Sequence, residues 1–183
     1  MAVTERAKKS ERRLNGAAME AALDRMAEAL LGSCDHPESL CLVGIRTGGV
    51  PLADRLAARM EPVLGRALER GTLDITLYRD DLLRGLDQPQ VGPTRLRFGL
   101  KDRWVVLVDD VLFTGRTVRA AIDALMDFGR PRRIVLAALV DRGGRELPIQ
   151  PDVVGEVLEV PGEASVEVRL TETHGRDEVV VLT

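Results

Sequence analysis

Two adjacent carboxylates, followed by a threonine-containing helix start, are the residues of this chain best suited to chemistry. Asp109 and Asp110 come directly after the apolar run 104–108, and Thr114, Gly115 and Thr117 follow them. Carboxylates accept hydrogen bonds from sugar hydroxyls, and the free N–H groups at a helix N-terminus bind anions such as phosphate. The segment therefore predicts a cradle for a ribose 5-phosphate.

Each part of this segment also has a purely structural interpretation. An Asp pair after a strand is often a turn and a helix cap, and Thr-Gly-x-Thr is common at helix starts. The joint arrangement is much rarer than either part. It contains neither the GxxxxGK[ST] loop nor the GxGxxG pattern, so it indicates a different phosphate site from those two.

The apolar pattern predicts an α/β fold around this segment. Buried strands are expected where apolar residues run continuously, at 40–44, 104–108 and 133–140. Helical spacing of apolar residues predicts helices over 17–31, 51–60 and 115–128. Two strand–helix–strand passages specify a parallel sheet covered on both faces. Ligands bind beyond the carboxyl ends of such strands, which is where Asp109 and Asp110 fall.

The rest of the chain is predicted as shorter elements and loops. A strand is expected at 73–78 and shorter strands at 153–160, 165–170 and 179–182. The Gly- and Pro-containing segment 79–103 is expected to be a long loop that covers a site. We expect residues 1–15 to be a disordered tail and residues 16–183 to form one domain.

Composition excludes several classes of protein. The 183 residues are 45% hydrophobic and 30% charged, as in globular proteins. With only two His and two Cys, a zinc site of the usual Cys/His kind is not expected. A net charge of −3, from 26 basic and 29 acidic residues, argues against coating nucleic acid by bulk electrostatics.

Location is predicted from the apolar runs. The first fifteen residues contain no apolar stretch, and the longest aliphatic run, 134–140, is too short to cross a bilayer. We therefore expect a cytoplasmic protein with no membrane partner, in which Cys34 and Cys41 are reduced thiols.

Three segments resemble a known family. VVLVDDVLFTGRT at 105–117 resembles the phosphoribosyl-pyrophosphate (PRPP) motif of type I phosphoribosyltransferases. GTLDITLYRDDL at 71–82 and VDRGGRELPI at 140–149 resemble the PyrR family, pyrimidine operon attenuators that are also uracil phosphoribosyltransferases. The resemblance covers about residues 17–182. It implies the type I phosphoribosyltransferase fold, a mainly parallel sheet flanked by helices with a small C-terminal hood.

The resemblance also implies an activity. Uracil and PRPP would give UMP and pyrophosphate, with Mg²⁺ carried by PRPP and no metal ligands expected from the protein. UMP-dependent attenuation through the pyrimidine-operon mRNA leader, and a homodimer or larger oligomer, are implied as well. Two alternatives stay open: a nucleotide-sensing RNA-binding attenuator with little catalytic activity, and a phosphoribosyltransferase for another base.

Site residues are assigned by matching positions to the family's motifs. The pyrophosphate-binding loop matches Arg46, Thr47, Gly48 and Gly49. The PRPP motif assigns nucleotide contacts to Asp109, Asp110, Val111, Leu112, Phe113, Thr114, Gly115, Arg116 and Thr117. Catalysis is assigned to Asp109, Asp110 and Arg79, the last of which begins a loop that closes over PRPP. Arg142 matches a nucleotide-contacting position and Val166, in the hood, a base-contacting one.

The chain departs from the family at several positions. Gly48 stands where Arg is usual, and Gly144 where His is common. On the RNA-binding side, neutral or acidic residues replace the usual ones at Asp24, Glu28, Gln150 and Glu156. Candidate RNA contacts remain at Arg25, Arg142 and Arg145. Because acidic residues repel phosphates, the nucleotide site is expected to be better preserved than the RNA surface.

Overall fold

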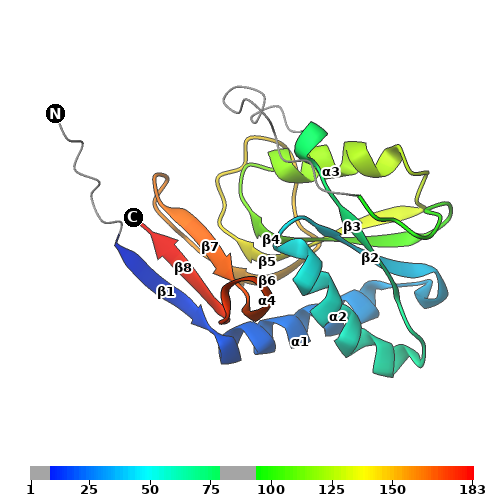
Figure 1. The fold of residues 1–183 in the computed structure, drawn as a ribbon, viewed down its shortest axis with the longest axis horizontal. Coiled ribbons are helices and arrows are strands. Elements are labelled where there is room, and N and C mark those ends of the chain that lie inside the picture. Colours follow the sequence, from blue (N-terminus) through cyan, green and yellow to red (C-terminus); the bar gives the residue numbers. More distant parts are fainter. Residues whose placement is uncertain (1–8, 79–93) are drawn as a thin grey trace.

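The computed structural model describes residues 9–78 and 94–183, which form two sheets (Figure 1). The larger sheet is entirely parallel, and its strand order is β3 (Glu69–Leu73), β2 (Leu40–Ile45), β4 (Trp104–Leu112), β5 (Arg133–Asp141) and β6 (Val153–Val157). The smaller sheet is antiparallel, in the order β1 (Ser10–Asn15), β8 (Glu178–Leu182) and β7 (Ser165–Arg169). The predicted α/β class with a parallel sheet and a hood is confirmed.

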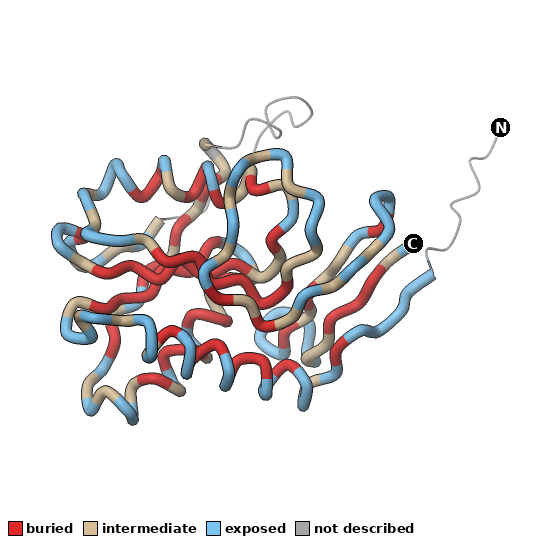
Figure 2. Tube along the Cα trace, turned by 180° about the vertical axis from the view of Figure 1, so that it is seen from behind, coloured by how far each residue is buried: buried red, intermediate tan, exposed pale blue. Residues whose placement is uncertain are grey.

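Helices cover both faces of the parallel sheet (Figure 1). On one face α1 (Gly16–Ser33) and α2 (Gly49–Leu64) pack against Val106 and Val108 of β4. On the other face α3 (Arg116–Met126) packs against Val105 and Leu107. Because β4 is buried on both faces, its residues 104–108 form a continuous apolar run, and Figure 2 shows the buried strands between the helical layers.

The three predicted helices are present, with ends that differ by a few residues. The structure adds short helical turns at Pro37–Ser39, Thr76–Tyr78 and α4 (Thr171–His174). Among the helices of the described residues, none has the length and apolar character needed to cross a membrane.

The predicted strand at 73–78 is wrong. The strand β3 ends at Leu73, and the Asp74 side chain then accepts the Thr76 backbone N–H at 2.9 Å. This side-chain bond closes a turn instead of continuing the strand. The alternation of apolar residues therefore predicted a strand in this region but placed it at 73–78, whereas the strand lies at 69–73.

The predicted disordered tail is wrong for residues 10–15. They form β1, which pairs with β8 so that Leu14 lies opposite Val179, both buried. The hood is thus built from both ends of the chain, as Figure 1 shows. Residues 1–8, the rest of the predicted tail, lie outside the described residues.

Candidate functional site

The Asp pair lies within the last part of β4, at the carboxyl edge of the parallel sheet. Asp109 is only 5% exposed, and its Oδ1 accepts the backbone N–H of Asp110 at 3.0 Å. Asp110 Oδ1 in turn accepts the Val111 N–H at 2.9 Å. These short local bonds fix both carboxylates near the end of the strand, where Asp109 lines the turn that leads into α3 and Asp110 lies against Gly48.

That turn forms a concave site of about 330 Å³ together with the start of α3. Gly115 has φ 90°, a left-handed conformation that side chains rarely adopt. Thr114 Oγ1 accepts the Arg116 N–H at 3.3 Å. The lining consists of Asp109, Val111, Leu112, Phe113, Thr114, Gly115, Arg116, Thr117 and Glu146. The structure thus gathers most of the predicted PRPP motif around one cavity at a helix N-terminus.

Arg145 stabilises the turn between β4 and α3 by hydrogen bonds. Its guanidinium donates to the carbonyl oxygens of Phe113 and Ile149, each at 2.9 Å, and to Asp141 Oδ2 at 2.6 Å. Burial acts to raise the pKa of Asp141, but Arg145 and the Gly143 N–H together hold that pKa below its ordinary value. With its side chain 13% exposed, Arg145 is turned into the protein and not toward an external phosphate.

Arg142 and Gly144 enclose the Phe113 ring. The Arg142 guanidinium lies 4.0 Å from the ring centroid and donates to the Ala164 carbonyl at 2.6 Å. Desolvation lowers the pKa of Arg142. A Cβ on Gly144 would lie 2.5 Å from Phe113 Cε2, and Gly144 has φ 74°. Glycine at 144 therefore allows the backbone to lie against Phe113, where a histidine would collide.

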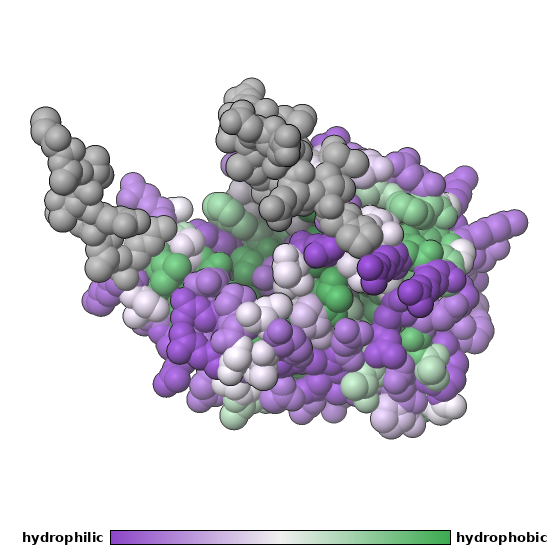
Figure 3. Space-filling view, in the orientation of Figure 1, coloured by the Kyte–Doolittle hydropathy of each residue, from purple (hydrophilic) through white to green (hydrophobic). Residues whose placement is uncertain are grey.

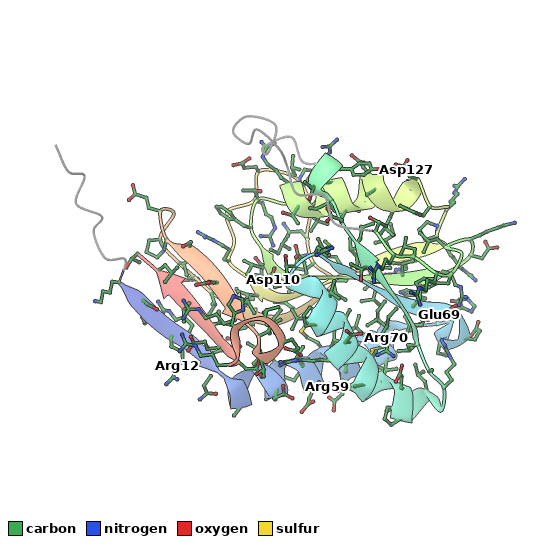
Figure 4. The ribbon with its side chains drawn as sticks, in the orientation of Figure 1. Arg12, Arg59, Glu69, Arg70, Asp110 and Asp127 are labelled. Carbon is green, nitrogen blue, oxygen red and sulfur yellow. The ribbon has the colours of Figure 1, made fainter. Side chains whose placement is uncertain are left out.

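The predicted pyrophosphate loop reaches the Asp pair from the adjacent strand β2. A Cβ on Gly48 would lie 2.2 Å from Asp110 Oδ2, and one on Gly49 would lie 2.1 Å from the Val108 carbonyl oxygen. The peptide bond between Arg46 and Thr47 is cis. Figure 4 shows Asp110 beside the start of α2, which follows this loop. Two segments about sixty residues apart in sequence thus meet because both glycines lack side chains.

A second cleft, of about 510 Å³, lies along the other side of this loop. Its lining combines Arg46, Thr47, Val50, Pro51, Thr72, Arg95 and Thr173. Sequence reasoning missed Thr72, Arg95 and Thr173. Arg95 lies in the segment predicted as a loop, where one arginine among scattered charges gives no signal.

The candidate RNA contacts do not form one exposed arginine patch. Arg25 donates to the Gly155 carbonyl at 3.0 Å and lies 3.8 Å from Glu156 Oε2. The side chains of Arg142 and Arg145 bond within the turn around Phe113. In Figure 3 the surface over the hood and α1 is predominantly hydrophilic, and there Asp24 pairs with Arg59 at 2.7 Å.

Val166 and Arg79 are the remaining predicted site residues. Val166 lies on β7 of the hood, half-buried against the core that α1 and α2 share. Arg79 lies outside the described residues. Within 9–78 and 94–183, no group of three or more His, Cys, Asp or Glu side chains could hold a metal ion.

The parallel sheet, the helix-start cradle and the glycine loop beside it define a phosphoribosyltransferase. A family model described as "Phosphoribosyl transferase domain" matches residues 11–169. The solved structure of the hypoxanthine phosphoribosyltransferase of Trypanosoma cruzi with the product IMP has the same fold. It is 16% identical, with a TM-score of 0.71 and coverage of 100% of this chain and 97% of that one.

Within that class the chain belongs to the PyrR family. It is 52% identical over 156 residues to the Bifunctional protein PyrR of Deinococcus radiodurans, which covers 85% of each chain. It is 50% identical over 166 residues to the Bifunctional protein PyrR of Thermus aquaticus, covering 91% of this chain and 92% of the relative.

Proposed function

We propose that this chain is a uracil phosphoribosyltransferase that converts uracil and PRPP to UMP and pyrophosphate. The observation that supports this best is the contact between Gly48 and Asp110. It places the glycine loop, with its backbone N–H groups, directly beside the carboxylates and the helix-start cradle. A substrate with a 5-phosphate, a ribose and a diphosphate can span this arrangement.

Each end of PRPP has a chemically matched partner. The 5-phosphate sits on the N-terminus of α3, where free N–H groups and the hydroxyls of Thr114 and Thr117 donate to it. The ribose hydroxyls donate to the carboxylates of Asp109 and Asp110. The leaving diphosphate lies against Arg46 and the backbone of residues 47–49. Uracil lies on the hood side, near Phe113, Arg142 and Val166.

Catalysis then depends on charge and position. As the bond between the anomeric carbon and pyrophosphate lengthens, positive charge develops on the ribose. Asp109 and Asp110 stabilise that charge, and the cradle holds the ribose in line with the base. Magnesium bound with PRPP would neutralise phosphate charge, and no ligand to that ion is assigned to the protein. Arg79, outside the described residues, is assigned to the loop that covers PRPP.

The test is direct turnover. Purified protein with uracil, PRPP and Mg²⁺ should form UMP, and Asp110→Ala should abolish that formation. Parallel reactions with orotate and with hypoxanthine test the alternative that another base is used. No turnover with uracil, or faster turnover with either other base, would overturn the assignment.

A second role, as a UMP-responsive attenuator, is supported by the naming of the relatives as bifunctional. The pairing of Asp24 with Arg59 and of Glu156 with Arg25 lowers the positive charge of the α1–β6 surface. We therefore expect weak binding to a pyrimidine-operon leader, measured at two salt concentrations with and without UMP. Tight, saturable binding enhanced by UMP would contradict this expectation and favour the attenuator as the main role.

We also propose a cytoplasmic location and a homodimer or larger assembly. For the location, both cysteines are free thiols, and burial raises the pKa of Cys41 to about 12, so Cys41 carries no reactive thiolate at neutral pH.

Light scattering of the purified protein measures its oligomeric state. A monomer at micromolar concentration would contradict the proposed homodimer or larger assembly.

A further inference from the structure

We infer that Arg95 binds the diphosphate end of PRPP, forming with Arg46 a clamp of two guanidinium groups in the 510 Å³ cleft. The inference rests on the proposed function and names a residue that no motif assigns to it. "The arginine clamp" below means Arg46 and Arg95.

The backbone of Arg95 is fixed against β3. Its N–H donates to the Thr72 carbonyl at 2.8 Å, and the Thr72 N–H donates to the Arg95 carbonyl at 3.0 Å. One residue before, Thr94 Oγ1 accepts the Asp74 N–H at 3.1 Å. These bonds attach the segment around Arg95 to the edge of the sheet.

Gly71 makes this close approach possible. A Cβ at that position would lie 2.3 Å from Leu96 Cδ2 and 3.3 Å from the Arg95 carbonyl oxygen. The absence of a side chain on β3 lets the 94–96 segment lie flat beside it. The base of the Arg95 side chain is thereby placed at a defined point on the cleft wall.

Arg46 approaches the same cleft from β2. Its N–H donates to the Leu73 carbonyl at 3.0 Å, which joins the glycine loop to the end of β3. Its Nε lies 3.9 Å from Asp74 Oδ2, so part of its charge is balanced, while 40% of the side chain remains exposed. Arg95, by contrast, is exposed and makes no ion pair with any residue in 9–78 or 94–183.

The chemistry of the cleft fits a diphosphate. Each guanidinium presents a planar fork of donors that matches two phosphate oxygens, and two forks match two phosphoryl groups. Thr72 and Thr173 line the cleft, and the first turn of α2, at Val50 and Pro51, adds the positive end of a helix dipole. Gly48 adds no charge, so Arg95 supplies the second cation.

The experiment measures pyrophosphate binding directly. Inorganic pyrophosphate with Mg²⁺ is titrated calorimetrically into the full chain, into Arg95→Ala and into Arg97→Ala. Arg97 is the matched control, because it is exposed, two residues away on the same segment, and absent from the cleft. Arg95→Ala should weaken binding about tenfold or more, and Arg97→Ala should leave it unchanged. Arg95→Lys should fall between, because an ammonium cannot bind two oxygens as a fork.

Steady-state kinetics give an independent reading. Arg95→Ala should raise the KM for PRPP by about tenfold and leave the KM for uracil unchanged. Equal pyrophosphate affinity in Arg95→Ala and Arg97→Ala, or no measurable pyrophosphate binding by the wild type, would overturn the inference. Arg95-dependent pyrophosphate binding without any turnover would support the clamp while rejecting the proposed reaction.

Discussion

Two arginines near the start of α2, Arg46 and Arg55, have opposite surroundings. Arg55, on α2, is 14% exposed and makes paired hydrogen bonds to Glu172 and to Asp177, at 2.7 to 3.1 Å. It also donates to Glu20 at 3.2 Å. Arg46, just before α2, has one carboxylate at 3.9 Å, and 40% of its side chain is exposed. The number of internal carboxylates separates an arginine that holds the fold from one that is available to a ligand.

The helix α2 links the surroundings of Arg55 to the cleft that Arg46 lines. The Arg55 cluster (Arg55, Glu20, Glu172 and Asp177) ties α2 to the hood, and Asp177 Oδ1 also accepts the Thr171 N–H at the start of α4. Thr173 of α4 lines the cleft of the arginine clamp. Figure 4 shows Arg59 between α1 and α2, where it bonds to Glu20 and Asp24 and extends the same network. The hood is therefore held to α2 by charges that line neither cleft.

The largest expected effect is loss of the Arg55 cluster. Arg55→Met should lower the free energy of unfolding by about 3 kcal/mol, because it removes five charge-assisted hydrogen bonds, two of which go to Asp177, a carboxylate only 19% exposed. Urea denaturation measures this change. The control is Arg119→Met, which removes a surface pair with Asp123 at 2.8 Å and should cost less than about 0.5 kcal/mol. Similar losses in both variants would erase the distinction between the two kinds of arginine.

A second prediction extends the comparison to the candidate RNA contacts. Arg145→Met should cost about 2 kcal/mol of stability, because it breaks the bonds to Asp141 and to two carbonyl oxygens. It should also raise the KM for PRPP, since the Phe113 carbonyl loses its support. Arg25→Met, at a side chain that is 59% exposed, should change stability by less than about 1 kcal/mol. If the Arg25 variant is the less stable of the two, Arg145 is not a structural arginine.

A third prediction concerns the glycine loop, the region with few internal bonds. Gly48→Ala places a Cβ where Asp110 Oδ2 now lies, so the carboxylate must move. We expect kcat/KM to fall about tenfold, equivalent to about 1.4 kcal/mol, because the Asp110 side chain is displaced from its position beside the glycine loop. Gly32→Ala is the control, because nothing lies within 4 Å of the Cβ that it adds. Wild-type kcat/KM in Gly48→Ala would show that Asp110 needs no fixed position.

The smallest expected effect is on pH dependence. Hydrogen bonds from Arg55 lower the pKa of Glu172 and of Asp177 below their ordinary values. Their contribution to stability is complete above those ordinary values, near pH 4 to 5, and is lost as the pH falls through the lowered ones. Wild-type stability, followed by urea denaturation, should therefore decline more steeply below about pH 4 than that of Arg55→Met. Parallel curves would contradict the role of the cluster.

Local sequence was sufficient for the central sheet and for one half of the site. Strands buried on both faces must be apolar throughout, so β4 and β5 stand out from their neighbours. The Asp pair and the helix start are adjacent in sequence, and thus their proximity needs no tertiary information. The β1 strand gave no such signal, because SERRLN has one apolar residue and is held by pairing with the far end of the chain.

The other half of the site depends on approaches between distant segments. The contact of Gly48 with the Asp110 side chain, and the passage of residues 94–96 across Gly71, each require a missing side chain on one segment and a close approach by another. A glycine in a loop has many interpretations in sequence. Its partner becomes visible only when the strand order places the two segments side by side.

The sequence by itself determined the central strands, the three long helices, the family and the carboxylate–threonine cradle, because periodicity and adjacent motifs are properties of short stretches. Only the tertiary structure decided which arginines pair with internal carboxylates and which line a cleft. The carboxylates around Arg55 are 35, 117 and 122 residues away in sequence. Since the role of a cation depends on the charges within a few ångströms, that role is settled by folding.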